Sequence, residues 1–322
     1  MTSALTNTQT VAIGIDVGGT KIAAGLVTSS GELLCRRLIP TQAERGGEVV
    51  LRDVEALALE LAGEAKAQGL SLSGMGVGVA ELIDLAGAVA SEHTIKWRGL
   101  PVVHRLSRVA PTRLEADVRA AALAEAKCGA GQGFDSFLYL TVGTGISCCL
   151  VLHGRPFAGA HGAALICASS SLTCRCAECG AENRFVLEEY AAGPALVNRY
   201  RRCTAVNVSQ AEQVFHHAAA GDQDARRVLE TAGSALGVTT GLLINVLDPQ
   251  AVVVGGGLGR AGGCYWESFV KSTREHTWSE LVRHIPIKRA ALDEAGVIGA
   301  ALTVWQTSKK SFGDDELDNL ER

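Results

Sequence analysis

The chain has 322 residues, of which 47% are hydrophobic and 20% are charged, and its formal net charge is −4 at pH 7. This length favours two domains around a cleft, and an acidic balance without a long basic run argues against nucleic acid as the main partner. No stretch has the length and apolar character of a membrane span, and the first residues lack the basic start and apolar run of a signal peptide. We therefore expect a cytoplasmic protein whose partners include neither nucleic acid nor membrane.

The first third of the chain combines short apolar runs with one long helical pattern. The runs predict buried strands and the pattern predicts a helix: strands are expected at residues 11–15, 23–27, 33–38 and 74–79, and the helix at 49–67. The first strand leads into a glycine-rich turn, Asp16-Val17-Gly18-Gly19-Thr20-Lys21. A turn without side chains lets backbone N–H groups approach an anion closely, so this turn is a candidate phosphate site.

The same pattern begins again in the middle of the chain. Apolar runs at residues 138–140 and 147–152 flank a second glycine-rich turn, Gly143-Thr144-Gly145. A duplicated α/β domain with a cleft between the copies explains this repetition economically. Two such turns facing each other would hold a polyphosphate from both sides, which indicates a nucleotide-dependent phosphotransferase.

Further helices and another glycine loop are expected around the second copy. Residues 118–128 form an alanine-rich helical pattern with Asp117 at its start, where a carboxylate meets the positive end of the helix dipole. A buried strand at 251–254 enters the glycine loop Gly255-Gly256-Gly257. We also expect helices at residues 209–220, 222–247 and 295–306, and a frayed charged tail at 308–322.

Together, the DVGGTK turn, the GTG turn, the Asp at a helix start and the GGGLG loop resemble the sugar kinases of the repressor, ORF and kinase (ROK) family, over about residues 11–306. The resemblance implies the actin-like, ribonuclease H-like ATPase fold of the α/β class, with two similar domains. It also implies transfer of the γ-phosphate of ATP to a sugar hydroxyl with Mg²⁺, and a homodimer. The expected domains are an N-terminal one at 1–117, joined by a C-terminal helix within 295–322, and a larger one at 118–294.

The resemblance assigns roles to individual residues. Asp117 would be the catalytic base, which takes the proton from the attacking hydroxyl, and Asp16 would help to organise Mg²⁺. The residues expected to line the nucleotide site are Asp16, Gly18, Gly19, Thr20, Lys21, Gly143, Thr144, Gly145, Gly255, Gly256 and Gly257. Structural alternatives stay open, because glycine clusters often form turns without a ligand and Asp is a common helix N-cap.

The sequence departs from the family in the sugar pocket. ROK glucokinases usually carry a Gly-Glu-x-Gly-His segment whose Glu and His contact the sugar, and an ungapped match places Leu165 to Ser169 there. Ala116 replaces the Asn before the base, whereas Glu188 matches a retained sugar-contacting acid. Glu81 stands where relatives typically have glycine. A buried carboxylate needs a partner, so we expect Glu81 to contact an amino sugar or a sugar-like C7-cyclitol, unless it points to solvent.

Four of the ten cysteines lie within residues 165–188: Cys167, Cys174, Cys176 and Cys179. In a large protein expected in the cytoplasm, this clustering favours a metal over disulfides. The family motif CxCGxxGCxE aligns with residues 179–188 and keeps only its first cysteine, Cys179. Cys174, Cys176 and Cys167 would complete a structural zinc site shifted along the loop. The alternative is free thiols.

We predict an ATP- and Mg²⁺-dependent kinase that phosphorylates a primary hydroxyl of a hexose-like substrate, an amino sugar or C7-cyclitol in preference to glucose. A glucokinase-type hexose kinase and a non-catalytic sugar-binding sensor are the alternatives, and a redox- or zinc-responsive interaction protein is a third. Retention of Asp16, Lys21 and Asp117 favours the enzyme, because a sensor has no chemical need for a base.

Overall fold

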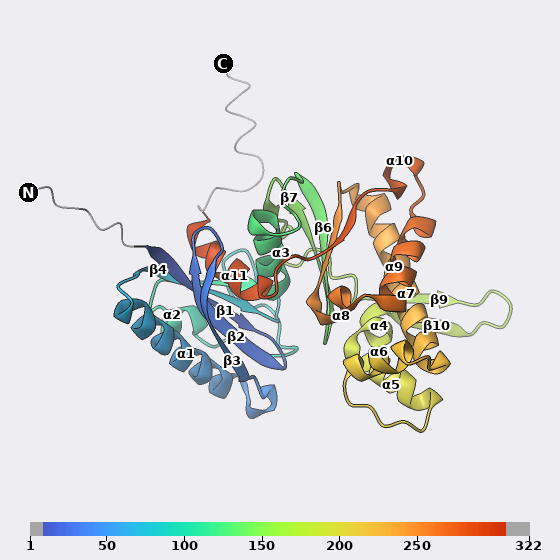
Figure 1. Ribbon diagram of the computed structural model, residues 1–322, viewed down its shortest axis with the longest axis horizontal. Helices are drawn as coiled ribbons and strands as arrows, with labels where there is room; N and C mark the ends of the chain where they lie inside the picture. Colours follow the sequence, from blue (N-terminus) through green and yellow to red (C-terminus); the bar gives the residue numbers. More distant parts are fainter. Residues whose placement is uncertain (1–8, 307–322) are drawn as a thin grey trace, which may run out of the picture.

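The computed structural model of the chain describes residues 9–306 as a mixed α/β structure built around two five-stranded sheets (Figure 1). The first sheet has the strand order β3-β2-β1-β4-β5. Strands β1, β2 and β3 form an antiparallel meander, and β4 and β5 extend the sheet in parallel with β1. These strands are β1 (Thr10–Val17), β2 (Lys21–Thr28), β3 (Leu33–Pro40), β4 (Ser71–Val79) and β5 (Thr112–Ala116).

The second sheet repeats this layout, with the strand order β12-β11-β6-β7-β8. Its first three strands in the chain are antiparallel, and β11 and β12 run parallel to β6. The strands are β6 (Ser136–Val142), β7 (Ile146–Leu152), β8 (Arg155–Pro156), β11 (Val252–Gly255) and β12 (Ile287–Arg289). Each strand takes the place of one in the first sheet, so the predicted duplication is confirmed. A separate exposed hairpin consists of β9 (Ser171–Arg175) and β10 (Glu182–Val186).

Helices cover the sheets and fill the space between them (Figure 1). The longest in the first half, α1, packs on β1, β2 and β4. Its buried residues recur every three or four positions, as expected of a helix with one apolar face. The helices are α1 (Gly47–Ala67), α2 (Val102–Leu106), α3 (Asp117–Cys128), α4 (Leu187–Ala191), α5 (Gly193–Cys203), α6 (Ala211–Ala219), α7 (Gln223–Leu247), α8 (Gly256–Ala261), α9 (Gly263–His276), α10 (Glu280–Arg283) and α11 (Ala295–Leu302). Within residues 9–306, none of these helices combines the length and the apolar character needed to cross a membrane.

Helices α3 and α11 lie between the two sheets (Figure 1) and pack against each other. Helix α11 also packs on β1 and β4 of the first sheet. The contacts are between backbones: a Cβ at Gly76 of β4 would overlap the Ala300 carbonyl oxygen, and a Cβ at Gly299 would overlap that of Ala120 in α3. The last described helix therefore returns to the N-terminal sheet, as expected. The domain boundaries stay a prediction, and residues 307–322 of that segment lie outside the described part.

Several elements of the second half were not predicted. Helix α9 begins at two glycines with positive φ, Gly262 and Gly263, which do not signal a helix start, although its buried residues share one face. It is held by α7, whose glycines at four-residue spacing let the backbone of α9 come close: Gly233, Gly237 and Gly241. Helix α5 and the hairpin β9–β10 were also missed.

Replacing Gly299 by Ala should destabilise the protein, because the new methyl group would push α11 and α3 apart. We expect the free energy of unfolding to fall by about 2 kcal/mol. Gly63 is the matched control, since it is also helical but its Cβ would meet open space. There the same substitution should stabilise by about 0.5 to 1 kcal/mol. Chemical denaturation of both variants checks this, and equal effects would contradict close packing between α3 and α11.

Candidate active site

The first glycine-rich turn joins β1 to β2 and is held by a residue outside it. The Gly18 N–H donates to the Lys21 carbonyl at 3.0 Å, which closes the turn. From the segment after β3, the Thr41 hydroxyl donates to the Gly18 carbonyl at 2.6 Å, and the Thr41 N–H donates to the Thr20 carbonyl at 3.0 Å. Thr20 and Lys21 are exposed. Thr41 is therefore a structural support of the turn that the sequence analysis missed.

The second glycine-rich turn joins β6 to β7. The Gly143 N–H donates to the Gly145 carbonyl at 2.9 Å, and the Gly143 carbonyl accepts from the Gly193 N–H at 2.8 Å. The Glu188 carboxylate accepts from the Ile146 N–H at 2.7 Å, which fixes the far end of the turn. A Cβ at Gly143 would meet no atom within 4 Å, so an anion can approach the backbone there. Whether this turn faces the first one across a single cleft stays a prediction.

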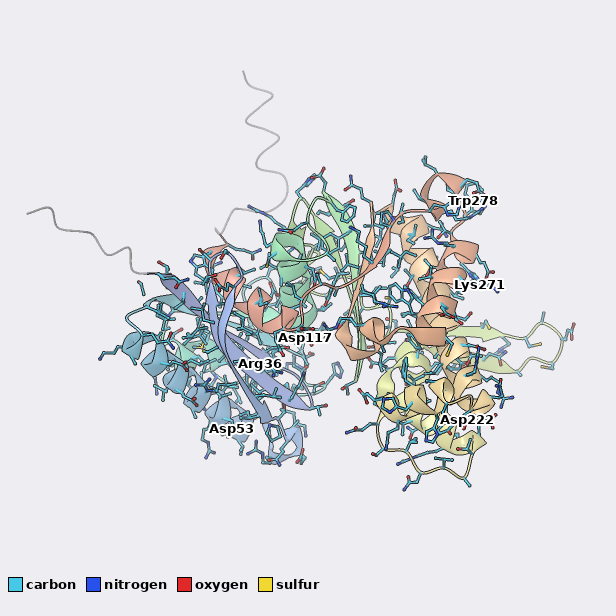
Figure 2. All side chains as sticks on the ribbon, in the orientation of Figure 1. Arg36, Asp53, Asp117, Asp222, Lys271 and Trp278 are labelled. Atoms are coloured by element: carbon cyan, nitrogen blue, oxygen red, sulfur yellow. The ribbon has the colours of Figure 1, made fainter. Side chains whose placement is uncertain are left out.

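Asp16 and Asp117 both lie close to Gly78 of β4. Asp16 is near the end of β1, and Asp117 is the first residue of α3. A Cβ at Gly78 of β4 would lie 3.6 Å from Asp117 Cα and 3.8 Å from Asp16 Oδ1, and a Cβ at Gly296 would overlap the Asp16 carboxylate. Glycine at position 296 thus makes room for the Asp16 carboxylate, whereas a Cβ at Gly78 would be in ordinary contact with both acids. In Figure 2, Asp117 lies between the two halves of the molecule.

Both carboxyl groups are harder to ionise than usual. Burial raises the pKa of Asp16 to about 7, and the charge of Asp117 adds to the effect while Lys21 opposes it. Burial likewise raises the pKa of Asp117 to about 6, with a hydrogen bond from the Val118 N–H at 2.6 Å acting in the opposite direction. Two desolvated acids in one place stabilise a bound cation and favour proton transfer near neutral pH.

Glu81 has a different environment from the one expected. Its buried carboxylate accepts hydrogen bonds from the Ser91 hydroxyl and from three backbone N–H groups at 3.0, 2.5 and 2.7 Å, those of His93, Thr94 and Ile95. Although burial acts to raise it, these bonds hold the pKa of Glu81 below its ordinary value. The premise that this carboxylate lacks a partner was therefore wrong. A direct contact of Glu81 with a substrate stays a prediction.

Arg119 is a further residue that the sequence analysis missed. It lies two positions after Asp117 and is buried, with 7% of its surface exposed. Its guanidinium donates to the Glu115 carboxylate at 2.6 Å, and to the Gly162 and Ile83 carbonyls at 2.7 Å each. The Ile83 loop follows β4 of the first sheet and the Gly162 loop follows β8 of the second. Arg119 thus joins loops of both halves beside the candidate base.

The third glycine cluster lies where β11 enters α8. A Cβ at Gly255 would overlap the Tyr139 hydroxyl, and a Cβ at Gly256 would overlap the Val142 carbonyl. These two glycines serve close packing on β6. A Cβ at Gly257 would meet no atom within 4 Å, so only the third glycine is open to a ligand.

The four cysteines predicted to bind zinc are not brought together. Cys174 lies on β9, and Cys176 and Cys179 lie at the turn that follows it. Cys167 instead contacts Cys148 of β7, with their Sγ atoms 3.2 Å apart. Within residues 9–306, no group of three or more His, Cys, Asp or Glu side chains is arranged to hold a metal ion. The predicted zinc site is not supported, because Cys167, one of its four predicted ligands, contacts β7 and not the hairpin.

Comparisons with known proteins find relatives that match over nearly the whole chain. A glucokinase of Halalkalibacterium halodurans is 28% identical over 91% of this chain and 94% of its own length. An N-acetylmannosamine kinase of Escherichia coli is 27% identical over 90% of this chain and 97% of its own. A solved structure of a ROK family glucokinase from Streptomyces griseus with glucose and AMPPNP superposes with a TM-score of 0.78, at 27% identity, over 90% of this chain and 98% of that one.

The three proteins named here are sugar kinases, and the superposition on the glucokinase structure, together with the two five-stranded sheets, confirms the predicted actin-like α/β fold class. The oligomeric state stays a prediction. The family model described as ROK family matches residues 12–307. This range contains both glycine-rich turns, the paired acids and the third glycine cluster. The chain belongs to the ROK family.

Proposed function

We propose that this protein is an ATP- and Mg²⁺-dependent kinase that phosphorylates a primary hydroxyl of a hexose-like sugar. The observation that carries the proposal is the position of Asp117, a desolvated acid at the start of α3 that lies beside Gly78 together with Asp16. Phosphoryl transfer needs a group that orients the attacking hydroxyl and groups that neutralise the phosphate charge, and these two acids are suited to one role each.

In this proposal, Asp117 accepts the proton of the sugar hydroxyl and points its oxygen at phosphorus. Asp16 holds Mg²⁺ through carboxylate oxygens, the ligand type that this ion prefers. The backbone at Gly143 and Gly257, where no side chain intrudes, leaves room for the nucleotide. ATP supplies the phosphoryl group and Mg²⁺ neutralises its charge when both are bound. Arg119 keeps the Ile83 and Gly162 loops in place beside the base.

The proposed substrate is an amino sugar or a C7-cyclitol in preference to glucose. The segment Leu165 to Ser169 has neither the Glu nor the His that the resemblance associates with glucose, and Ala116 has no amide. The Oε2 atom of Glu188 accepts a hydrogen bond from the Ile146 N–H. Its other carboxylate oxygen accepts none from residues 9–306. Because Glu81 is satisfied by its own chain, Glu188 is the better candidate to bind a polar group of the substrate.

Replacing Asp117 by Asn should abolish most activity while leaving the fold intact. An amide is far too weak a base to accept the proton of the sugar hydroxyl, so kcat should fall by about a thousandfold. Asp135→Asn, at an exposed position, is the matched control and should keep the wild-type rate. Substrate-dependent ADP release measures both. Equal rates for Asp117→Asn and the wild type would exclude Asp117 as the base and favour a sensor or another mechanism.

Activity should depend on pH through the same group. Asp117 must be deprotonated to act as a base, and its pKa is raised to about 6 by burial. With Mg²⁺ at saturating concentration, so that the cation keeps Asp16 deprotonated, we therefore expect kcat/KM to be constant well above pH 6 and to fall by about tenfold for each pH unit below it. The pH profile of kcat/KM reports on the free enzyme and checks this. A midpoint near 4, the ordinary range of an aspartate, would contradict the environment assigned to Asp117.

Substrate preference should distinguish a kinase of amino sugars or C7-cyclitols from a glucokinase. In competition at equal concentrations, amino sugars or C7-cyclitols should be phosphorylated in preference to glucose, because Leu165 to Ser169 offer glucose no side-chain carboxylate or imidazole. The measurement is the ratio of kcat/KM values in one assay with shared ATP. If glucose clearly outcompetes the others, the substrate proposal is wrong and the glucokinase alternative replaces it.

A further inference from the structure

Two cysteines meet beside the second turn, outside the chemistry assigned above. Cys148 lies on β7, and Cys167 lies in the loop that leads from β8 to β9. Their Sγ atoms are 3.2 Å apart. Cys148 is buried, with 5% of its surface exposed, whereas Cys167 is half-buried and in reach of solvent. One thiol of the pair is thus shielded and the other is accessible.

The loop backbone holds Cys167 against β7. Leu165 has a φ of 59°, in the left-handed region that a leucine rarely adopts, and the Cys167 N–H donates to the Leu165 carbonyl at 2.8 Å. The next residue, Ala168, accepts a hydrogen bond at its carbonyl from the Glu188 N–H at 3.0 Å. Strained backbone persists only where its surroundings fix it, so the thiol contact belongs to a well-determined arrangement.

We propose that Cys148 and Cys167 are a redox-active dithiol that hydrogen peroxide converts into a disulfide, locking the loop of residues 158–168 onto β7. The Cys167 thiolate attacks one peroxide oxygen, the O–O bond breaks, and a sulfenic acid and hydroxide form; the hydroxide takes up the proton released by Cys167 to give water. The Cys148 sulfur then displaces the sulfenic hydroxyl, which leaves as a second water with the Cys148 proton. Two thiols are oxidised and one peroxide is reduced.

The two thiols differ in the way that these two reaction steps require. The hydrogen bond from Cys148 holds the pKa of the Cys167 thiol below its ordinary value, so Cys167 ionises first. Donating that bond, together with burial, raises the pKa of Cys148 well above its ordinary value. The accessible cysteine is therefore the attacking thiolate and the buried one the resolving thiol.

Closing the disulfide would move the loop. An S–S bond is about 2 Å long, so the sulfurs must approach by about 1 Å. Ala168 would carry this shift to Glu188, whose carboxylate fixes Ile146 at the end of the second turn. This consequence for the sugar site rests on the proposed kinase function; formation of the disulfide does not.

The test uses the full chain with the four cysteines of the hairpin and of α5 replaced: Cys174→Ser, Cys176→Ser, Cys179→Ser and Cys203→Ser. After treatment of the reduced protein with hydrogen peroxide, peptide mapping should find residues 148 and 167 cross-linked, reversibly with dithiothreitol. Hydrogen exchange at residues 158–168 and at Ile146 should slow. With glucose and N-acetylmannosamine as probes, KM for whichever is phosphorylated should rise by about tenfold on oxidation, because the loop is displaced by about 1 Å.

Cys149→Ser is the matched control. Cys149 is also buried but packs in the cluster on the opposite face of the sheet, so this variant should still form the cross-link, whereas Cys167→Ser should not. Peroxide that oxidises Cys167 to a sulfinic acid while Cys148 stays free would overturn the proposal. So would a cross-link that leaves hydrogen exchange unchanged. A protein inactive on both sugars would count against the kinase proposal alone, since the cross-link is read without activity.

Discussion

The site depends on the close backbone contact between α3, α11 and the first sheet. Because Gly76 and Gly299 have no side chains, α11 lies directly on β4 and on α3. Helix α3 begins at Asp117, and α11 begins one residue before Gly296, which lies against the Asp16 carboxylate. The first turns of both helices are therefore brought to the end of β1. Helix N-termini carry partial positive charge, which favours carboxylates and phosphates in that place.

Two further acids act on Asp16 and Asp117, and each of them has a partner within the protein. Besides Asp117, the charge of Glu294 raises the pKa of Asp16, and Glu294 is paired with Arg36 of β3 at 2.6 Å. On the other side, Glu81 contributes to the raised pKa of Asp117 while organising residues 91–95. A methyl group of that segment, on Thr94, lies 2.8 Å from the position that a Cβ of Gly19 would occupy. Glu81 thus supports the first glycine-rich turn and also helps to raise the pKa of Asp117, the candidate base.

The parts of the structure that were predictable are those with a local signal. Glycine turns between apolar runs, and Asp117 before an alanine-rich helix, were readable because each depends on a few adjacent residues. The environment of Glu81 was not, since its donors lie 10 to 14 positions away in a segment without a periodic pattern. The predicted zinc site is not supported for a similar reason, because Cys148, the partner of Cys167, lies in a strand that sequence spacing does not relate to the loop. Arg119 was missed because its carbonyl partners leave no side-chain signature.

Glu188 connects the loop of residues 158–168 to the second glycine-rich turn. Its N–H donates to Ala168 in the loop that aligns with the family's sugar-binding segment, and its carboxylate accepts from Ile146 at the end of the second turn. A single residue at the start of a short helix therefore fixes the two elements relative to each other. The loop has lost the polar side chains of that segment but keeps this connection and a glycine-like backbone at Leu165. If the protein is the kinase proposed above, the scaffold that would align the acceptor with the phosphate is thus separable from the side chains that would select the acceptor, so substrate specificity can change within it while the position of Asp117 is maintained.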